Sequence, residues 1–160
     1  MNWKDEGLVL STRRYGENSL IVNLLTNKHG RHSGMVRAGS STRNRGLYQP
    51  GNHLRVEWKG RLIEHLGTFI GELVKSNAAV LFNDPLPLIA LSSATAILDV
   101  VLPERAPVPE QFVELTQLIE FLGKTGWEIR YLRWEMKLLQ HLGFGLDLTE
   151  CAATGSKQDL

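Results

Sequence analysis

Apolar and polar side chains alternate along several short runs in residues 1–76. A period of two is typical of β-strands that bury one face, because successive side chains point to opposite sides of a sheet. The alternation is most regular at His53–Lys59. Leu54, Val56 and Trp58 share one face of this run, so we expect Trp58 in the core. Five strands are predicted, which are Gly7–Tyr15, Ser19–Thr26, His32–Ala38, His53–Lys59 and Leu62–Leu73.

Residues 77–160 follow a helical spacing instead. Asp84 followed by Pro85 is typical of an N-cap and a first helical residue, and the long apolar run after them predicts a buried helix. Three helices are expected, which cover Leu86–Val101, Pro109–Leu122 and Trp127–Leu142. The sequence therefore predicts an α+β protein in two parts, a five-stranded β-barrel over residues 1–76 and an α-helical domain over residues 77–160.

The charged residues are unevenly distributed between these two parts. Residues 1–75 carry 12 Lys and Arg against 6 Asp and Glu, whereas residues 76–160 carry 6 against 11. Between Asn18 and Val56 the sequence has no Asp or Glu. A long block of one sign predicts a surface for a polyanion, and nucleic acid is the commonest large polyanion. A five-stranded barrel that binds nucleic acid is of the oligonucleotide-binding (OB) type, which is the fold we expect.

The centre of this basic stretch, residues 39–46, is rich in Gly, Ser and Asn and is predicted to form a loop that presents Arg43 and Arg45. Basic side chains along a strand of nucleic acid contact its phosphates, and aromatic rings stack on its bases. Tyr48, next to the loop, is the candidate for stacking. The alternative is a solvated basic loop without a ligand. The candidate nucleic-acid-binding residues are Arg13, Arg14, Lys28, Arg31, Arg37, Arg43, Arg45, Tyr48 and Arg55.

Few residues in the sequence suggest catalysis. The glycine-rich segment lacks the Lys-Ser/Thr pair of a phosphate-binding P-loop. The five His residues are dispersed and Cys151 has no second Cys at ligand spacing, so we expect neither a metal nor another cofactor. A single Cys favours a reducing compartment, and no run is apolar enough for a signal peptide or a membrane helix. These features predict a soluble cytoplasmic protein that is not an enzyme.

Several short segments together resemble one known family. They are GLVL at 7–10, YGE at 15–17, SLIV at 19–22, TNKHG at 26–30, QPG at 49–51 and LLQHLGFGLDL at 138–148. In combination, over almost the whole chain, these segments are similar to the bacterial recombination mediator RecO. The resemblance implies an N-terminal OB barrel followed by a helical domain. It also implies binding of single- and double-stranded DNA, strand annealing, and a role in DNA repair and recombination.

The resemblance further implies protein partners at the nucleoid. These are RecR, the acidic, Phe-ending tail of single-strand-binding protein and, indirectly, the recombinase RecA, which is loaded onto DNA coated by that protein. Such a tail requires an apolar slot rimmed by Arg, and the third helix has a basic stripe beside aromatic residues. The alternative is an aromatic core with solvated arginines. The candidate pocket residues are Trp127, Arg130, Tyr131, Arg133 and Lys137.

Two features depart from the family pattern. Some members carry a four-Cys zinc finger after the LDL segment, whereas Cys151 here has no second Cys nearby, which argues against zinc. The family also extends further than Leu160, so we expect this chain to lack part of the helical domain. Two other functions remain open beside the mediator. One is a protein-interaction adaptor whose barrel binds an acidic protein surface, and the other is an RNA-binding OB protein.

Overall fold

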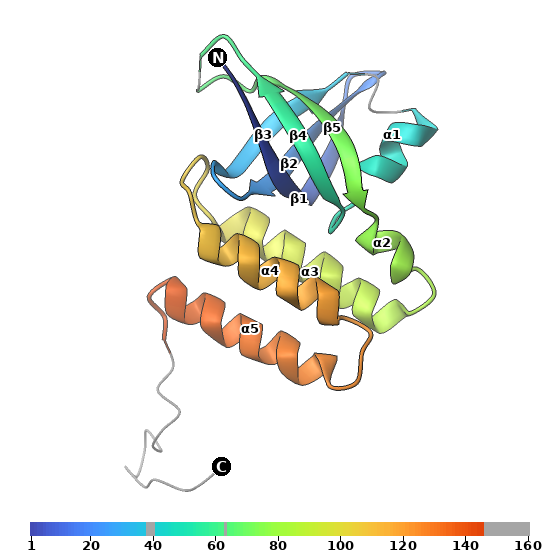
Figure 1. Ribbon diagram of the computed structural model, residues 1–160, viewed down its shortest axis with the longest axis vertical. Coiled ribbons are helices and arrows are strands. Elements are labelled where there is room, and N and C mark those ends of the chain that lie inside the picture. The colour runs from blue at the N-terminus through green and yellow to red at the C-terminus, as the bar shows by residue number, and fades with distance from the viewer. Residues whose placement is uncertain (38–40, 63, 146–160) are drawn as a thin grey trace, which may run out of the picture.

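The chain folds into a barrel of strands followed by stacked helices (Figure 1). The computed structural model describes residues 1–37, 41–62 and 64–145. The elements in chain order are β1 (Asn2–Tyr15), β2 (Ser19–Thr26), β3 (Gly30–Val36), α1 (Thr42–Leu47), β4 (His53–Lys59), β5 (Thr68–Lys75), α2 (Asn77–Val80), α3 (Pro85–Val101), α4 (Pro109–Phe121) and α5 (Trp127–His141). The predicted α+β class, with the strands before the main helices, is confirmed.

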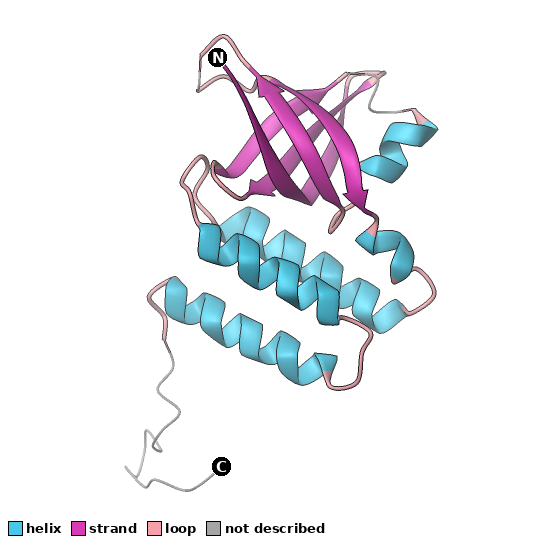
Figure 2. Ribbon diagram, in the orientation of Figure 1, coloured by secondary structure: helices cyan, strands magenta, loops and turns pink. Residues whose placement is uncertain are grey.

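The five strands close into a barrel in the order β1-β2-β3-β5-β4 (Figure 2). Neighbouring strands are antiparallel except β3 and β5, which meet in parallel at Met35 and Thr68. A five-stranded closed barrel with a short helix between its third and fourth strands is of the OB type. The predicted OB-type barrel is therefore confirmed.

The interior of the barrel is filled by side chains from alternate strand positions, as the period of two predicts. Trp58 is the largest of them and is fully buried. Its indole Nε1 donates a hydrogen bond to the carbonyl of Leu66 at 3.1 Å, which satisfies the polar atom of the ring. The buried residues of this core are Val9, Leu20, Val22, Leu24, Val36, Tyr48, Leu54, Val56, Trp58 and Phe69.

Strand β1 buries side chains on both of its faces. Val9 belongs to the barrel core, whereas Leu8 and Leu10 pack outside the barrel, together with Leu25 of β2, against the helices. Burial of each leucine side chain contributes roughly 2 kcal/mol. The hydrophobic core of the helical part thus includes the outer wall of the barrel, so the two parts form one packed unit.

The helices α3 and α4 lie directly against the barrel, and α5 packs on α4 on the far side (Figure 1). One face of α4 is apolar and buried, from Phe112 to Leu122. Helix α3 buries only one side, and Leu86, Ile89 and Val100 on its other side are exposed, which differs from the fully buried helix that its composition predicted. Within the residues that the structure describes, no helix is both long and apolar enough to cross a membrane.

Residues 42–46, which belong to the segment predicted to be a loop, form most of helix α1. The hydroxyl of Ser41 accepts a hydrogen bond from the backbone N–H of Asn44 at 3.3 Å and so caps the helix N-terminus. At the other end, Asn52 Nδ2 donates to the carbonyls of Gly46 and Leu47 at 3.0 and 3.1 Å. These side-chain bonds satisfy backbone groups at both helix ends, so a Gly- and Asn-rich segment becomes helical.

Several strand boundaries also differ from the prediction, most of all the starts of β1 and β5. Strand β1 begins at Asn2 because it pairs with β4 from its first residue, where Asn2 lies opposite Lys59. Strand β5 begins at Thr68 rather than at Leu62. Gly67, with a φ of +61°, lies against the indole of Trp58, and this contact ends the β4–β5 loop just before the strand.

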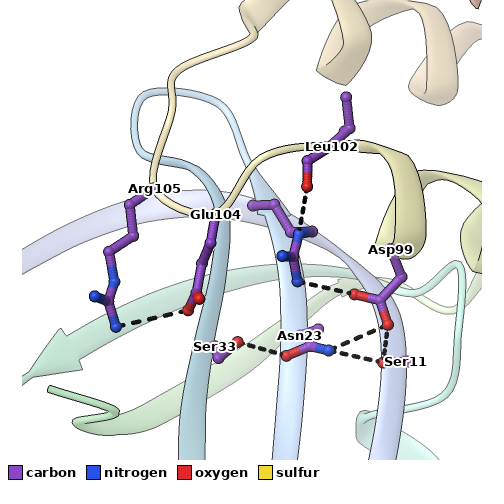
Figure 3. A network of polar contacts seen from close by, with 8 residues as sticks. Ser11, Asn23, Ser33, Asp99, Leu102, Glu104 and Arg105 are labelled. Atoms are coloured by element: carbon purple, nitrogen blue, oxygen red, sulfur yellow. Dashed lines mark hydrogen bonds and ion pairs between the residues drawn. The ribbon is translucent and has the colours of Figure 1, made fainter. Parts of the chain in front are cut away.

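A network of polar contacts joins the barrel to the C-terminal end of α3 (Figure 3). The carboxylate of Asp99 accepts hydrogen bonds from Ser11 Oγ at 2.6 Å and Asn23 Nδ2 at 3.1 Å, and it pairs with the guanidinium of Arg31 at 3.4 Å. Ser33 Oγ donates to Asn23 Oδ1 at 2.7 Å. One carboxylate from the helical part is therefore held by side chains of β1, β2 and β3.

The segment between α3 and α4, residues 102–108, runs beside β3. Its Leu102 carbonyl accepts a hydrogen bond from Arg31 Nε at 2.8 Å, and the backbone N–H of Arg105 donates to the Arg31 carbonyl at 2.7 Å. Strand β3 pairs with β5 only at Met35, so this backbone bond occupies part of an edge that β5 leaves open. We call residues 102–108 the connecting segment.

Gly30, at the start of β3, touches the connecting segment closely. Its φ is +67°, and a Cβ atom built on it would overlap the carbonyl of Ala106. Any side chain here would suffer both a left-handed backbone conformation and a clash with backbone atoms that cannot rotate away. Gly30 therefore permits the close approach of the two parts.

Removal of the Asp99 carboxylate should destabilise the protein more than removal of a surface carboxylate. Asp99→Ala removes one acceptor from the half-buried guanidinium of Arg31 and one from each of two polar side chains, so we expect the free energy of unfolding in urea to fall by about 2 kcal/mol. The control is Glu120→Ala, whose exposed pair with Lys75 spans 3.9 Å, and which should change it by less than about 0.5 kcal/mol. Equal losses in both variants would contradict this role of Asp99.

Candidate nucleic-acid interface

The outer face of β2 and β3 is partly occupied by the protein itself. OB barrels commonly bind oligonucleotides on this face and on the β1–β2 and β4–β5 loops. Here Asn23 and Ser33 on this face belong to the Asp99 network, and the connecting segment lies beside β3. The helical part thus covers this portion of the face. The β1–β2 and β4–β5 loops, which lie at opposite ends of β1, are the other two places where an OB barrel binds oligonucleotides.

Three of the predicted arginines lie together beside the β1–β2 loop. Arg13 and Arg14 are near the end of β1, and Arg45 lies on α1. With Tyr48 they line one shallow pocket of about 170 Å³, and all three arginines are exposed. The pocket brings together cations that are more than 30 positions apart in the sequence.

Arg37 belongs to the same end of the barrel. Arg14, Leu20 and Val36 are aligned across β1, β2 and β3, and Arg37 directly follows Val36 and is exposed. Since neighbouring strands are about 4.8 Å apart, the backbones at positions 14 and 36 are separated by roughly 10 Å. We call Arg13, Arg14, Arg37 and Arg45 the basic end.

Within the described part of the chain, the cations of the basic end form no ion pair. Among the described residues, none of these four arginines has an Asp or Glu oxygen within 4.0 Å. In contrast, Lys4 and Lys59 pair with Glu57, and a hydrogen bond from Lys59 lowers the pKa of that carboxyl. The guanidinium groups of the basic end are therefore not engaged in ion pairs among the described residues, which leaves them available for phosphates.

Three other predicted basic residues lie elsewhere. Arg31 is held in the Asp99 network, so its guanidinium already has partners inside the protein. Arg55 lies on β4 directly between Glu6 of β1 and Glu72 of β5, which offsets its charge. Lys28 is exposed in the β2–β3 turn, near the other end of β1. The structure does not bring these three residues to the basic end.

Tyr48 is buried, which contradicts its predicted availability for base stacking. Its side chain is part of the barrel core with 3% exposure, and its hydroxyl lies against the backbone of Gly71. Burial raises the pKa of the Tyr48 hydroxyl. Tyr48 instead anchors the end of α1 and so positions Arg45, three residues earlier. The side chain of Arg43, also among the candidates, lies outside the described part of the chain.

An aromatic stack near the other end of β1 was not predicted from the sequence. The ring of Trp3 stacks on Trp58 at 5.7 Å with an angle of 14°, and the ring of His29 stacks on Trp3 at 4.0 Å with an angle of 9°. Trp3 is followed by the charged residues 4–6, which hide its place in the alternation of a strand. Only the pairing of β1 with β4, in which Trp3 lies opposite Trp58, places the Trp3 ring in this stack.

His32 lies beside this stack and is 1% exposed. Its ring meets Trp3 and Trp58 edge-on at 5.1 and 5.0 Å, and burial lowers its pKa from 6.5. Within the described residues, no group of three or more His, Cys, Asp or Glu is arranged to hold a metal ion. Cys151, considered above for zinc, lies outside these residues.

A groove of about 510 Å³ runs between α4 and α5. Three of the five residues predicted for a peptide pocket line it, namely Arg130, Arg133 and Lys137. The guanidinium of Arg130 lies 4.9 Å from the centre of the Phe121 ring, and Lys137 pairs with Glu114 at 2.8 Å. The apolar lining of the groove comes from Leu118, Phe121, Ile129 and Trp134.

The other two predicted pocket residues lie outside this groove. Trp127 and Tyr131 pack against the hydrophobic core of the helices. Burial and the nearby carboxylate of Glu135 raise the pKa of Tyr131. The three aromatic side chains of α5 therefore have different surroundings. Trp134 contacts both the core and the groove, whereas Trp127 and Tyr131 pack against the core.

The fold and this surface define an OB-barrel protein with a fused helical domain and an exposed arginine cluster at one end of the barrel. Residues 1–77 match the family described as Recombination protein O N terminal, and residues 83–160 match the family described as Recombination protein O C terminal. The chain therefore belongs to the RecO family, and the resemblance found in the sequence is confirmed.

Curated relatives named DNA repair protein RecO match the whole chain or nearly so. The relative from Cereibacter sphaeroides is 49% identical over 160 residues, which are 100% of this chain and 66% of the relative. That from Roseobacter denitrificans is 44% identical over 161 residues, with 100% and 67% covered, and that from Rhodospirillum centenum is 48% identical over 155 residues, with 97% and 62% covered. The chain spans about two thirds of the length of these relatives.

His32 should make the protein sensitive to mild acid. Because burial lowers the pKa of His32 in the folded state, the unfolded chain takes up a proton below pH 6.5 that the folded protein resists. The contribution of His32 to the free energy of unfolding is therefore fully present above the pKa of the unfolded chain. It is lost as the pH falls through the lower pKa of the folded protein. In urea unfolding at pH 7.5, 6.5 and 5.5, His32→Phe should lose less stability on acidification than the wild type. Parallel curves for the two proteins would show that His32 does not titrate in this range.

Proposed function

We propose that this chain acts in DNA repair as part of a recombination mediator that binds DNA and has no catalytic activity. The observation that carries the proposal is the basic end, where four exposed arginines lie without a nearby carboxylate among the described residues. Membership of a family whose curated relatives are named DNA repair protein RecO supports the repair role.

Arginine suits contacts to phosphate because its planar guanidinium donates paired hydrogen bonds to two oxygens. Contacts to phosphates leave the base edges unread, so binding tolerates any sequence and accepts both single- and double-stranded DNA. When two single strands bind side by side, neutralised phosphates repel one another less. The basic end would promote strand annealing in this way.

The placement of the arginines favours such binding because three of the four are held on a strand or a helix. Arg13 and Arg14 lie on β1 where it pairs with β2, and Arg45 lies on a short helix anchored through Tyr48 in the barrel core. Side chains on fixed backbone lose less freedom on binding than side chains on a mobile loop.

We further propose that the helical part binds protein partners. The groove between α4 and α5 combines an apolar lining with Arg130 and Arg133, so it fits an acidic peptide that ends in Phe, such as the tail of single-strand-binding protein. Contacts to this tail and to RecR would bring the protein to coated DNA and assist loading of RecA. Family membership supports these partners and a location at the cytoplasmic nucleoid.

Loss of the basic end should weaken DNA binding and its salt dependence together. In fluorescence anisotropy with a labelled single-stranded oligonucleotide, we expect Arg13→Ala/Arg14→Ala/Arg45→Ala to bind at least about tenfold more weakly. The slope of log K against log salt should fall by about 2, because each phosphate contact to a single strand contributes about 0.7. Circular dichroism checks that the variant is folded.

The matched control removes three cations that already have carboxylate partners, Lys4→Ala/Lys59→Ala/Lys75→Ala, and should bind almost as tightly as the wild type. Equal losses in both triple variants would mean that net charge, rather than the basic end, binds DNA. Salt-insensitive or absent DNA binding by the wild type would favour the protein-interaction adaptor. Clear preference for RNA over DNA of the same sequence would favour the RNA-binding alternative.

The peptide groove makes a separate prediction. A labelled peptide with several acidic residues and a C-terminal Phe should bind the wild type, and Arg130→Ala/Arg133→Ala should weaken this binding about tenfold, since two charge-assisted contacts are lost. Deletion of the terminal Phe from the peptide should have a similar effect. Arg13→Ala/Arg14→Ala is the matched control and should leave peptide binding unchanged. A peptide that binds all of these proteins equally would exclude the groove as its site.

A further inference from the structure

Three parallel rings lead from the interior of the barrel to its surface. Trp58 is fully buried, Trp3 stacks on it and is half-buried, and His29 stacks on Trp3 with 30% of its side chain exposed. Among the described residues, Trp3 is the one aromatic ring in contact with His29. The outermost ring of the stack is therefore backed by two indoles, while its own side chain remains partly accessible to solvent.

The imidazole of His29 is held in a fixed orientation. Its Nδ1 lies 3.1 Å from Oδ2 of Asp5, and its backbone N–H donates to Thr26 Oγ1 at 3.1 Å. Asp5 also accepts a hydrogen bond from the backbone N–H of Lys28 at 2.7 Å, and its side chain is only 3% exposed. Rotation of the His29 ring away from Trp3 would deprive a buried carboxylate of a partner, so the ring face is pre-organised.

The surroundings of His29 suit a strand of nucleic acid. Lys28 is exposed next to it in the β2–β3 turn, and Arg61 is exposed on the β4–β5 loop. That loop is joined to the same stack, because the indole of Trp58 donates to the carbonyl of Leu66 at 3.1 Å. In OB barrels this loop commonly contacts oligonucleotides. Aromatic faces accept any base and cations contact the phosphates between them.

We propose that a base of single-stranded DNA stacks on His29 and extends the row of rings formed by Trp58 and Trp3. This inference rests on the proposed DNA binding and adds a site for bases near the opposite end of β1 from the basic end, which contacts phosphates. A base in a duplex is already stacked and paired, whereas a base in a single strand is free to stack on a protein ring. The stack therefore confers a preference for single strands that an arginine cluster alone does not provide.

The test compares two labelled oligonucleotides with equal numbers of phosphates, oligo-dT and a fully abasic strand of the same length. The ratio of their dissociation constants measures the contribution of the bases. We expect the wild type to prefer oligo-dT by roughly tenfold, the size that stacking of one base provides. His29→Gln, which keeps a polar side chain but removes the ring, should abolish this preference.

Two further variants make the outcomes distinct. His29→Phe keeps the ring without its polar atoms and should retain the preference, which also shows that loss of the Asp5 contact is not the cause. Arg13→Ala/Arg14→Ala/Arg45→Ala should weaken binding of both strands and leave the ratio unchanged. Normal binding with an unchanged ratio in His29→Gln would overturn the stacking site alone. Absence of binding to either strand by the wild type would overturn the DNA-binding function and the stacking site together.

Discussion

The carboxylate of Asp99 is the contact on which the arrangement of the molecule depends. It accepts hydrogen bonds from Ser11 and Asn23 and pairs with Arg31, which lie on three neighbouring strands. It does so from the last turns of a helix whose buried side packs against Leu8 and Leu10. Without this acceptor, each of these half-buried groups would lose a partner, at a cost comparable to the apolar gain from burying a leucine. With the Asp99 carboxylate in place, the outer face of β1 and β2 forms one side of the hydrophobic core of the helical part.

This junction also determines where a ligand can bind. A free OB barrel offers the face of β2 and β3 together with its loops. Here the helical part covers a portion of that face. The exposed arginines lie at one end of β1, and the aromatic stack lies near the other. The phosphate contacts and base contacts that we propose therefore fall at separate places. In a bare barrel with both on one face, they would compete for the same residues.

The order of strands and helices could be predicted because each depends on a local period. His53–Lys59 and Ser19–Thr26 alternate or are apolar over the lengths that the structure shows. Helix α1 could not be predicted from the sequence of its own segment. Its last carbonyls accept hydrogen bonds from Asn52, which lies beyond the helix in the chain and is not part of any known helix-capping pattern. The charge imbalance likewise predicted a basic barrel, but the partner of Arg31 is 68 residues away and those of Arg55 depend on strand register. The place of Trp3 in the aromatic stack could not be predicted either, because it depends on the pairing of β1 with β4.

Gly30 has a consequence for how members of this family can diverge. Its missing side chain leaves room for the backbone of Ala106, which belongs to the other half of the chain. A barrel from one relative joined to helices from another would have to match at this contact, at the carboxylate of Asp99 and along the leucines of β1 simultaneously. The two halves are thus not interchangeable modules. A domain boundary at residue 76 would divide a hydrophobic core to which both halves contribute.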